Sequence, residues 1–67
     1  MTNEEIDALR SLIGSKVLVI TKTGETLKGI WKTNLVNTAN TQVRLVLETE
    51  NSTIIFPIKH IKSIEKQ

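Results

Sequence analysis

The sequence VLVITKTGETLKGIW, residues 17–31, decides how this chain folds. Apolar residues recur two apart, a Thr-Gly pair follows, apolar residues return, and a second glycine comes five positions after the first. Alternation with a period of two is typical of β-strands, and a glycine between two such runs permits the positive φ of a tight turn. The stretch therefore predicts a β-hairpin that turns at Gly24, with Gly29 marking a bend or a close backbone approach.

Further apolar runs follow the hairpin. In residues 43–48, Val43, Leu45 and Leu47 alternate with Arg44, Val46 and Glu48. Residues 54–56 form a short apolar run that ends at Pro57, and isoleucines recur every three residues over 58–64. We interpret these runs as a third strand, a fourth strand, and a 3₁₀-like turn that leads into a short closing strand. The polar residues 34–42, rich in asparagine and threonine, predict a loop between the second and third strands.

A short helix is predicted before the hairpin, over about residues 3–13. Thr2 or Asn3 can cap it, and the acidic residues that follow suit the positive end of its dipole. Ile6, with the leucines and isoleucine after it, gives one apolar stripe, and Gly14 is expected to end the helix. The predicted fold is mainly β: an N-terminal α-helix followed by a strongly bent five-stranded antiparallel β-barrel over about residues 15–65, in a single domain spanning 1–67.

Composition limits how so small a domain gains stability. The 67 residues contain no cysteine and one histidine, so disulfides are excluded and a structural zinc site is disfavoured. Self-association is the remaining way to increase burial. The net charge of +2 permits a nucleic-acid partner without demanding one. Because the start is acidic and no apolar run is long enough to span a membrane, a cytoplasmic protein is expected.

At these positions the chain resembles the Sm-like family of small β-barrel ring proteins, in its LSm and Hfq-type forms. The first motif of that family reads G-x-x-V-x-V-x-L-x-x-G-x-x-x-x-G, and this chain matches it with Gly14, Val17, Val19, Gly24 and Gly29, carrying Thr21 at the leucine position. The resemblance covers nearly the whole chain. It implies a homo-oligomeric ring that binds single-stranded RNA near its pore.

The resemblance also implies where RNA would bind. The family's Asp and Asn of the loop after the second strand correspond to Leu35 and Ala39, and three asparagines lie close to them. Hfq-type members carry a Lys-His pair before the last strand, and this chain similarly carries Lys59 and His60 just before Ile61. The predicted RNA-binding residues are Asn34, Asn37, Asn40, Lys59, His60 and Lys62. Two simpler roles stay open for these residues, because asparagine tolerates turn geometry and exposed lysines discourage strands from aggregating.

The resemblance further implies that the fourth strand of one subunit pairs with the fifth strand of the next. The residues predicted at this interface are Ile54, Ile55, Phe56, Ile61 and Ile64. Trp31 is expected in the core or an interface rather than stacked on a base. The ending around Pro57 also resembles the PRC-barrel family. An alternative interpretation is therefore a protein–protein adaptor similar to that family, without RNA binding. A closed ring favours the first interpretation, and a monomer or simple dimer favours the second.

Catalysis has little support in the sequence. No set of serine, histidine and aspartate can be placed together, and no glycine-rich phosphate loop of the usual spacing is present. We therefore expect a binding protein and not an enzyme, with no cofactor, no metal and no small-molecule substrate. Its expected partners are single-stranded RNA and further copies of itself, without a membrane.

Overall fold

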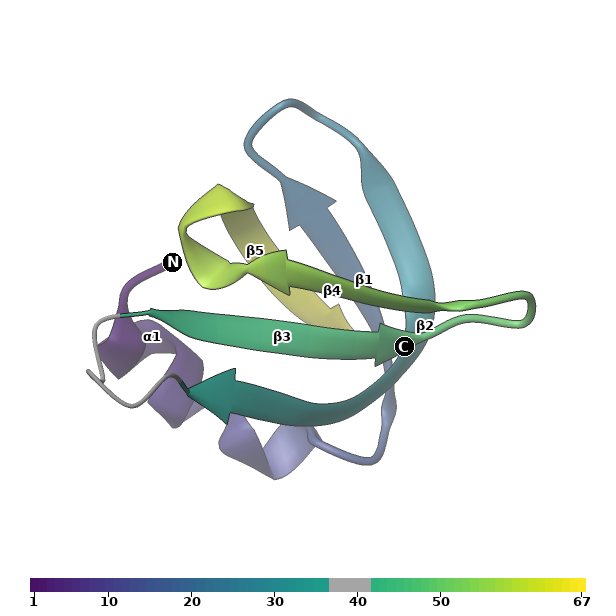
Figure 1. The fold of residues 1–67 in the computed structure, drawn as a ribbon, viewed down its shortest axis with the longest axis horizontal. Helices are drawn as coiled ribbons and strands as arrows, with labels where there is room; N and C mark the ends of the chain where they lie inside the picture. The colour runs from purple at the N-terminus through teal and green to yellow at the C-terminus, as the bar shows by residue number, and fades with distance from the viewer. Residues whose placement is uncertain (37–41) are drawn as a thin grey trace.

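The computed structural model describes residues 1–36 and 42–67, which form a short helix and one antiparallel sheet (Figure 1). The elements in chain order are helix α1 (Asn3–Ala8), 3₁₀ turn η1 (Arg10–Leu12), strands β1 (Lys16–Thr21), β2 (Thr26–Val36), β3 (Val43–Glu48) and β4 (Thr53–Pro57), 3₁₀ turn η2 (Ile58–His60) and strand β5 (Ile61–Lys66). The strand order across the sheet is β4-β3-β2-β1-β5, and each neighbouring pair is antiparallel. The mainly β class with an N-terminal helix is confirmed.

The predicted hairpin is formed by β1 and β2. Its register pairs Lys16 with Ile30 at one end and Ile20 with Thr26 at the other. Gly24 takes a φ of 91°, a conformation that costs a glycine little because it has no Cβ. The turn is closed by backbone hydrogen bonds across it, one of them from the N–H of Gly24 to the carbonyl oxygen of Thr21 at 3.0 Å.

Strand β2 bends at Gly29, as the sequence predicts. Its first half pairs with β1 and its second half, from Ile30 onward, pairs with β3 (Figure 1). A Cβ atom at Gly29 would lie 2.5 Å from the carbonyl oxygen of Glu48, so β3 approaches here more closely than a side chain allows. Because Gly29 has no side chain, the single long strand β2 can pair with β1 along its first half and with β3 along its second half.

The sheet does not close into the predicted barrel. Within the described residues, β4 and β5 each pair on one side only and form the two edges of the sheet. The three-residue turn η2 joins β4 directly to β5, and Figure 1 shows these two strands running in roughly opposite directions, because the bend of β2 turns one half of the sheet against the other.

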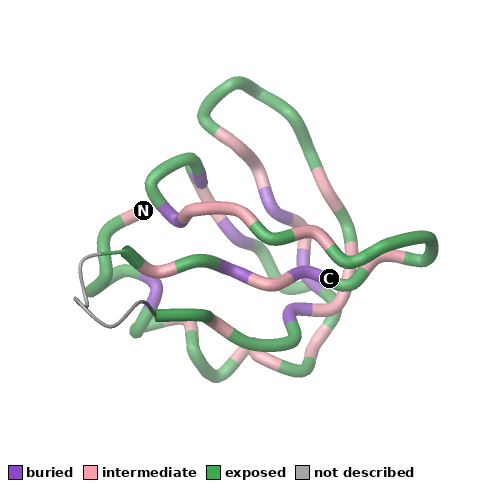
Figure 2. Tube along the Cα trace, in the orientation of Figure 1, coloured by how far each residue is buried: buried purple, intermediate pink, exposed green. Residues whose placement is uncertain are grey.

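The core lies inside the curve of the sheet and is completed by the helix. Trp31 is its largest member and is fully buried. Figure 2 shows the alternation along β3, where Leu45 and Leu47 are buried between more exposed neighbours. The buried hydrophobic residues are Ile6, Val17, Val19, Trp31, Leu45, Leu47, Ile58, Ile61 and Ile64. The expectation that Trp31 belongs to a core is confirmed.

The helix is shorter than the predicted range of 3–13. It ends at Ala8, because Leu9 leaves the helical region at φ −101° and ψ 7° and its N–H bonds to the carbonyl oxygen of Ile6, three residues back. The turn η1 then tightens the chain further. At the other end, Thr2 caps the helix as predicted and forms a reciprocal capping box with Glu5.

Two other boundaries bear on the candidate site. The isoleucine spacing of three predicts the turn η2 and the strand after it, and both are found. By contrast, β2 continues through Val36, so Asn34, which the sequence places in a loop over 34–42, lies in a strand. The pairing of β2 with β3, which extends to Val36 and Val43, accounts for the longer strand.

Candidate nucleic-acid interface

One end of the sheet gathers the segments on which the RNA prediction rests. The register places Leu35 of β2 opposite Arg44 of β3, and Arg44 opposite Pro57 of β4. The turn η2 follows Pro57 directly, so η2 lies at the same end of the sheet as the end of β2 and the start of β3 (Figure 1). Asn34 on β2 and Lys59 and His60 on η2, all predicted to bind RNA, therefore lie toward the same end of the sheet.

The basic residues of η2 are exposed because their neighbours are buried. Ile58 and Ile61 enter the core with 5% and 0% of their surface exposed, and a 3₁₀ turn places residues three apart on the same side. Lys59 and His60, which lie between them, consequently face solvent. Lys62 is also exposed, at the start of β5. The three basic residues predicted for RNA are thus accessible.

The position of η2 is fixed by backbone hydrogen bonds. The carbonyl oxygen of His60 accepts from the N–H of Lys22 at 2.9 Å, which ties η2 to the end of β1. The α-amino group of Met1 donates to the carbonyl oxygens of Ile58 and Ile61, each at 2.8 Å. The turn is held from two directions, so its exposed side chains project from a fixed backbone.

Asn34 has a partner inside the chain. Its Oδ1 atom accepts a hydrogen bond at 2.9 Å from Nε1 of the buried Trp31. The register shift between Trp31 and Thr33 explains the contact, because a bulge lets residues three apart share one side of a strand. Sequence alternation carries no signal of this shift. The other two predicted asparagines, Asn37 and Asn40, lie outside the described residues.

The five residues predicted at the oligomer interface separate into three environments. Ile61 and Ile64 are buried in the chain's own core, at 0% and 7% exposure. Ile54 and Phe56 are half-buried on the inner side of β4, and Ile55 is 50% exposed on the opposite side.

A groove opens where the sheet fails to close. It has a volume of about 380 Å³ and lies between the β1–β2 hairpin, the inner side of β4 and η2. Its lining residues are Thr21, Lys22, Thr23, Glu25, Leu27, Ile54, Phe56 and His60. The apolar part of this groove therefore adjoins the unpaired edge of β4, and its rim includes one of the predicted RNA-binding residues.

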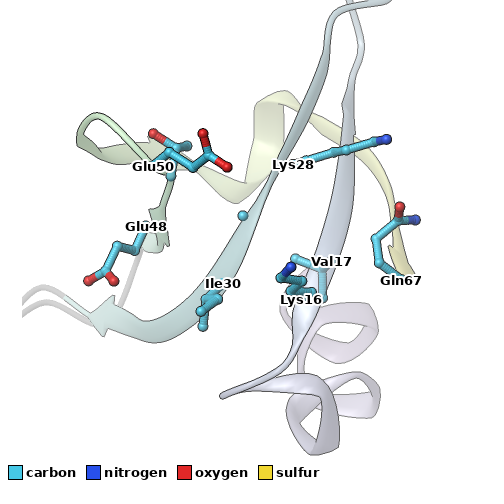
Figure 3. Close-up of a pocket in the computed structure, with 9 residues that line it drawn as sticks. Lys16, Val17, Lys28, Ile30, Glu48, Glu50 and Gln67 are labelled. Carbon is cyan, nitrogen blue, oxygen red and sulfur yellow. The ribbon is translucent and has the colours of Figure 1, made fainter.

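A second groove lies at the bend of β2 and differs in its charge (Figure 3). It has a volume of about 580 Å³, with Lys16 and Lys28 contributed by the β1–β2 hairpin, and Glu48 and Glu50 by the end of β3 and the turn after it. Glu48 also pairs with Lys32 at 3.9 Å on an exposed surface. Since the two ammonium groups are balanced by two carboxylates, this groove offers a polyanion less attraction than η2 does.

Hydrogen bonds at the start of α1 shift the titration of one carboxyl group. The pKa of Glu5 is lowered from its ordinary value, chiefly because the backbone N–H of Thr2 donates to the carboxylate and the Thr2 side chain adds a second hydrogen bond. Among residues 1–36 and 42–67, no group of three or more histidines, cysteines or acidic residues is arranged to hold a metal ion.

Comparison of the chain with protein-family models, curated proteins and solved structures found no match. Of the helices in the described part of the chain, none is long and apolar enough to cross a membrane. A functional proposal therefore rests on the geometry of the sheet, its edges and its exposed side chains.

Proposed function

We propose that this chain forms a homo-oligomeric Sm-like ring that binds single-stranded RNA in the cytoplasm. The observation that carries the proposal is the open sheet, whose two outer strands are unpaired on one side within the described residues. The proposal adds that β4 of one copy pairs with β5 of the next.

Unpaired strand edges favour such an association. An edge strand presents backbone N–H and C=O groups that can pair with another chain, and β4 and β5 offer one such row at each side of the same sheet. Joining one edge to the other is a head-to-tail contact, which closes into a ring when the rotation between copies permits it. Both edges are then covered in every copy.

The groove beside β4 gives the contact an apolar component. Ile54 and Phe56 are half-buried there, and a strand added to β4 would cover more of their surface. Each 100 Å² of apolar surface removed from water contributes roughly 2.5 kcal/mol before association costs are counted. For a chain of 67 residues, whose own core is small, this gain would be substantial.

RNA binding is supported by the exposed basic residues of η2. Lys59 and His60 stand on a fixed turn, and rotation about a ring axis would repeat them once per copy. A circle of Lys59 side chains attracts phosphates more strongly than one copy with a net charge of +2. Single-stranded RNA also exposes base edges, with which side-chain amides can form hydrogen bonds.

The first experiment is to measure solution mass by light scattering, with and without uridine-rich and adenine-rich RNA oligonucleotides. The expected result is a mass of several subunits that increases when one of the oligonucleotides is added. A monomer would contradict the ring. A ring whose mass is unchanged by either RNA, with no binding in a direct titration, would contradict the RNA part and leave the assembly standing.

The residues of η2 give a prediction for RNA affinity. Replacing both Lys59 and His60 with alanine should weaken RNA binding and reduce the slope of log K against log salt, because fewer phosphates lose their counterions. The matched control replaces Lys16 and Lys28, which line the charge-balanced groove, and should weaken binding less. Titrations at several salt concentrations measure both effects. Equal losses in the two double variants would contradict a site at η2.

A protein–protein adaptor without RNA binding is the second candidate. The observation that favours it is the exposure of large aliphatic residues, with Leu35, Val36 and Ile55 each 45–53% exposed. A monomer or simple dimer that binds no RNA in the same experiment would support this adaptor function and contradict the ring.

A further inference from the structure

The outer face of the sheet, on the side away from the core, carries a defined apolar patch. Two cross-strand rows build it: Thr33, Val46 and Ile55 are aligned in one, and Leu35, Arg44 and Pro57 in the next. Residues aligned in this way lie on the same face of a sheet. We call the group formed by Leu35, Val46, Ile55 and Pro57 around Arg44 the outer patch.

The outer patch is accessible in its apolar part. Leu35 is 45% exposed and Ile55 is 50% exposed, although both are large aliphatic residues. Val46 and Pro57, beside them, are half-buried. Leu35 and Ile55 lie on either side of β3, whose Arg44 and Val46 occupy the same face between them. Aliphatic residues gathered on one face of a sheet in this way indicate a binding surface more strongly than residues scattered singly.

Arg44 supplies a charge within this apolar surround. Its residue is exposed on β3, and the ion pairs found in the described part of the chain join Asp7 to Arg10 and Glu48 to Lys32. Residues 37–41 contain no acidic side chain. Among the acidic side chains of residues 1–36 and 42–67, none is therefore paired with the guanidinium of Arg44. Its planar array of donors fits a carboxylate in a bidentate geometry.

These observations decide between possible occupants. A symmetric contact between two copies through the outer patch would bring two Arg44 guanidinium groups together, and like charges at an interface are unfavourable. Single-stranded RNA is commonly stacked on aromatic side chains, but the two aromatic residues of the chain, Trp31 and Phe56, lie on the inner side. A protein segment with aliphatic side chains and one carboxylate can do both: its aliphatic groups contact the apolar residues of the patch, and its carboxylate pairs with Arg44.

We propose that the outer patch is a docking surface for a partner protein, which it recognises through a short segment with an aspartate or glutamate flanked by aliphatic residues. This inference does not depend on the ring. The surface lies on the outer face of β2, β3 and β4, whereas the proposed ring uses the edges of β4 and β5. Each copy in a ring would present one such surface.

The test begins with selection from a displayed library of random linear peptides against the whole protein. The expected consensus is one acidic residue flanked by leucine, isoleucine or valine. The best peptide is then titrated into isotopically labelled protein, and its amide signals should shift at residues of the outer patch. Failure to enrich any peptide, a consensus without an acidic residue, or shifts confined to another surface would overturn the proposal.

Variants identify which groups carry the affinity. Arg44→Gln should weaken binding of the selected peptide about tenfold, as expected for loss of one charge-assisted hydrogen-bonded pair. Arg44→Glu should reverse the preference toward a peptide with lysine in place of its acidic residue, and Ile55→Ser should weaken both peptides. Arg10→Gln, which removes an exposed arginine of η1 outside the patch, is the matched control and should leave affinity unchanged. Equal affinity of wild type and Arg44→Gln, or displacement of the peptide by RNA alone, would overturn the assignment.

Discussion

Gly29 shows how one residue shapes the whole sheet. Replacing it with alanine would place a Cβ 2.5 Å from the backbone oxygen of Glu48 and 3.1 Å from the side chain of Leu47. Alanine also restricts the unfolded chain, which favours folding by about 0.4–1 kcal/mol. The clash is with backbone and cannot be relieved by rotating a side chain, so overpacking of about 1–3 kcal/mol outweighs that gain. We expect Gly29→Ala to lower the free energy of unfolding by about 1–2 kcal/mol.

Chemical denaturation of Gly29→Ala and of Lys28→Ala measures this effect. Lys28 is the exposed neighbour of the glycine on the same strand and should tolerate the change nearly unaltered. A Gly29→Ala protein as stable as the wild type would show that β2 and β3 can separate at this point without cost.

The hydrogen bond between Trp31 and Asn34 gives a second prediction at this scale. Asn34→Ala leaves the indole N–H of a buried tryptophan without its acceptor, which costs about 1–3 kcal/mol. In a Trp31→Phe background the same change at Asn34 should cost little, because no donor remains. Circular dichroism can follow unfolding of the four proteins of this cycle, with tryptophan fluorescence as a second probe for the two that keep Trp31. An equal loss in both backgrounds would refute the structural role of the bond.

Single residues differ in how far their roles could be predicted. Gly24 and Gly29 were predicted from their spacing, because a turn and a close approach each demand a residue without a Cβ. Asn34 was predicted as a loop residue. Its hydrogen bond to Trp31 depends on the register shift in β2. The alternation of apolar and polar residues does not reveal where such a shift occurs, so the sequence does not predict this bond.

At the scale of elements, the helix α1 depends on its cap. The lowered pKa of Glu5 means that folding favours the carboxylate, so its stabilisation is present above the pKa of the unfolded chain and is lost as the pH falls through the lower folded value. Glu5→Gln should remove this part of the acid dependence while keeping a side chain that accepts the hydrogen bond from Thr2. Unfolding measured from neutral to acidic pH tests the difference in slope. Parallel curves for wild type and variant would contradict it.

Elements differ in predictability for physical reasons. The strands and η2 follow from hydrophobic spacing, since burial selects residues two apart in a strand and three apart in a 3₁₀ turn. The length of the helix does not follow from this spacing. The apolar stripe continues past Ala8, because Leu9, Leu12 and Ile13 still pack on the core although the helix has ended. The outer patch required the register of three strands, and single-strand patterns do not contain it.

At the scale of the whole molecule, the closed barrel was predicted from strand number, whereas the pairing of the strands determines the outcome. β1 pairs with β2 and β5, and β3 pairs with β2 and β4, so within the described residues β4 and β5 are left as the two edges of one sheet. A second copy can cover each edge without changing this pairing.

The side of β4 that meets the next copy can be tested with two matched substitutions. Ile54 lines the groove beside the hairpin, and its neighbour Ile55 lies on the outer face. In the proposed ring, Ile54→Lys would bury a charge at the contact between copies, so we expect the assembly to dissociate to monomers. Ile55→Lys makes the same chemical change on the opposite face. The sequence alone places Ile55 at the interface too, but Ile55 does not line the groove, so we now expect this variant to keep the mass of the wild type. Sedimentation velocity of both variants, with circular dichroism to confirm folding, distinguishes the results. Dissociation by both substitutions would extend the contact over both faces of β4, and dissociation by neither would remove β4 from the interface.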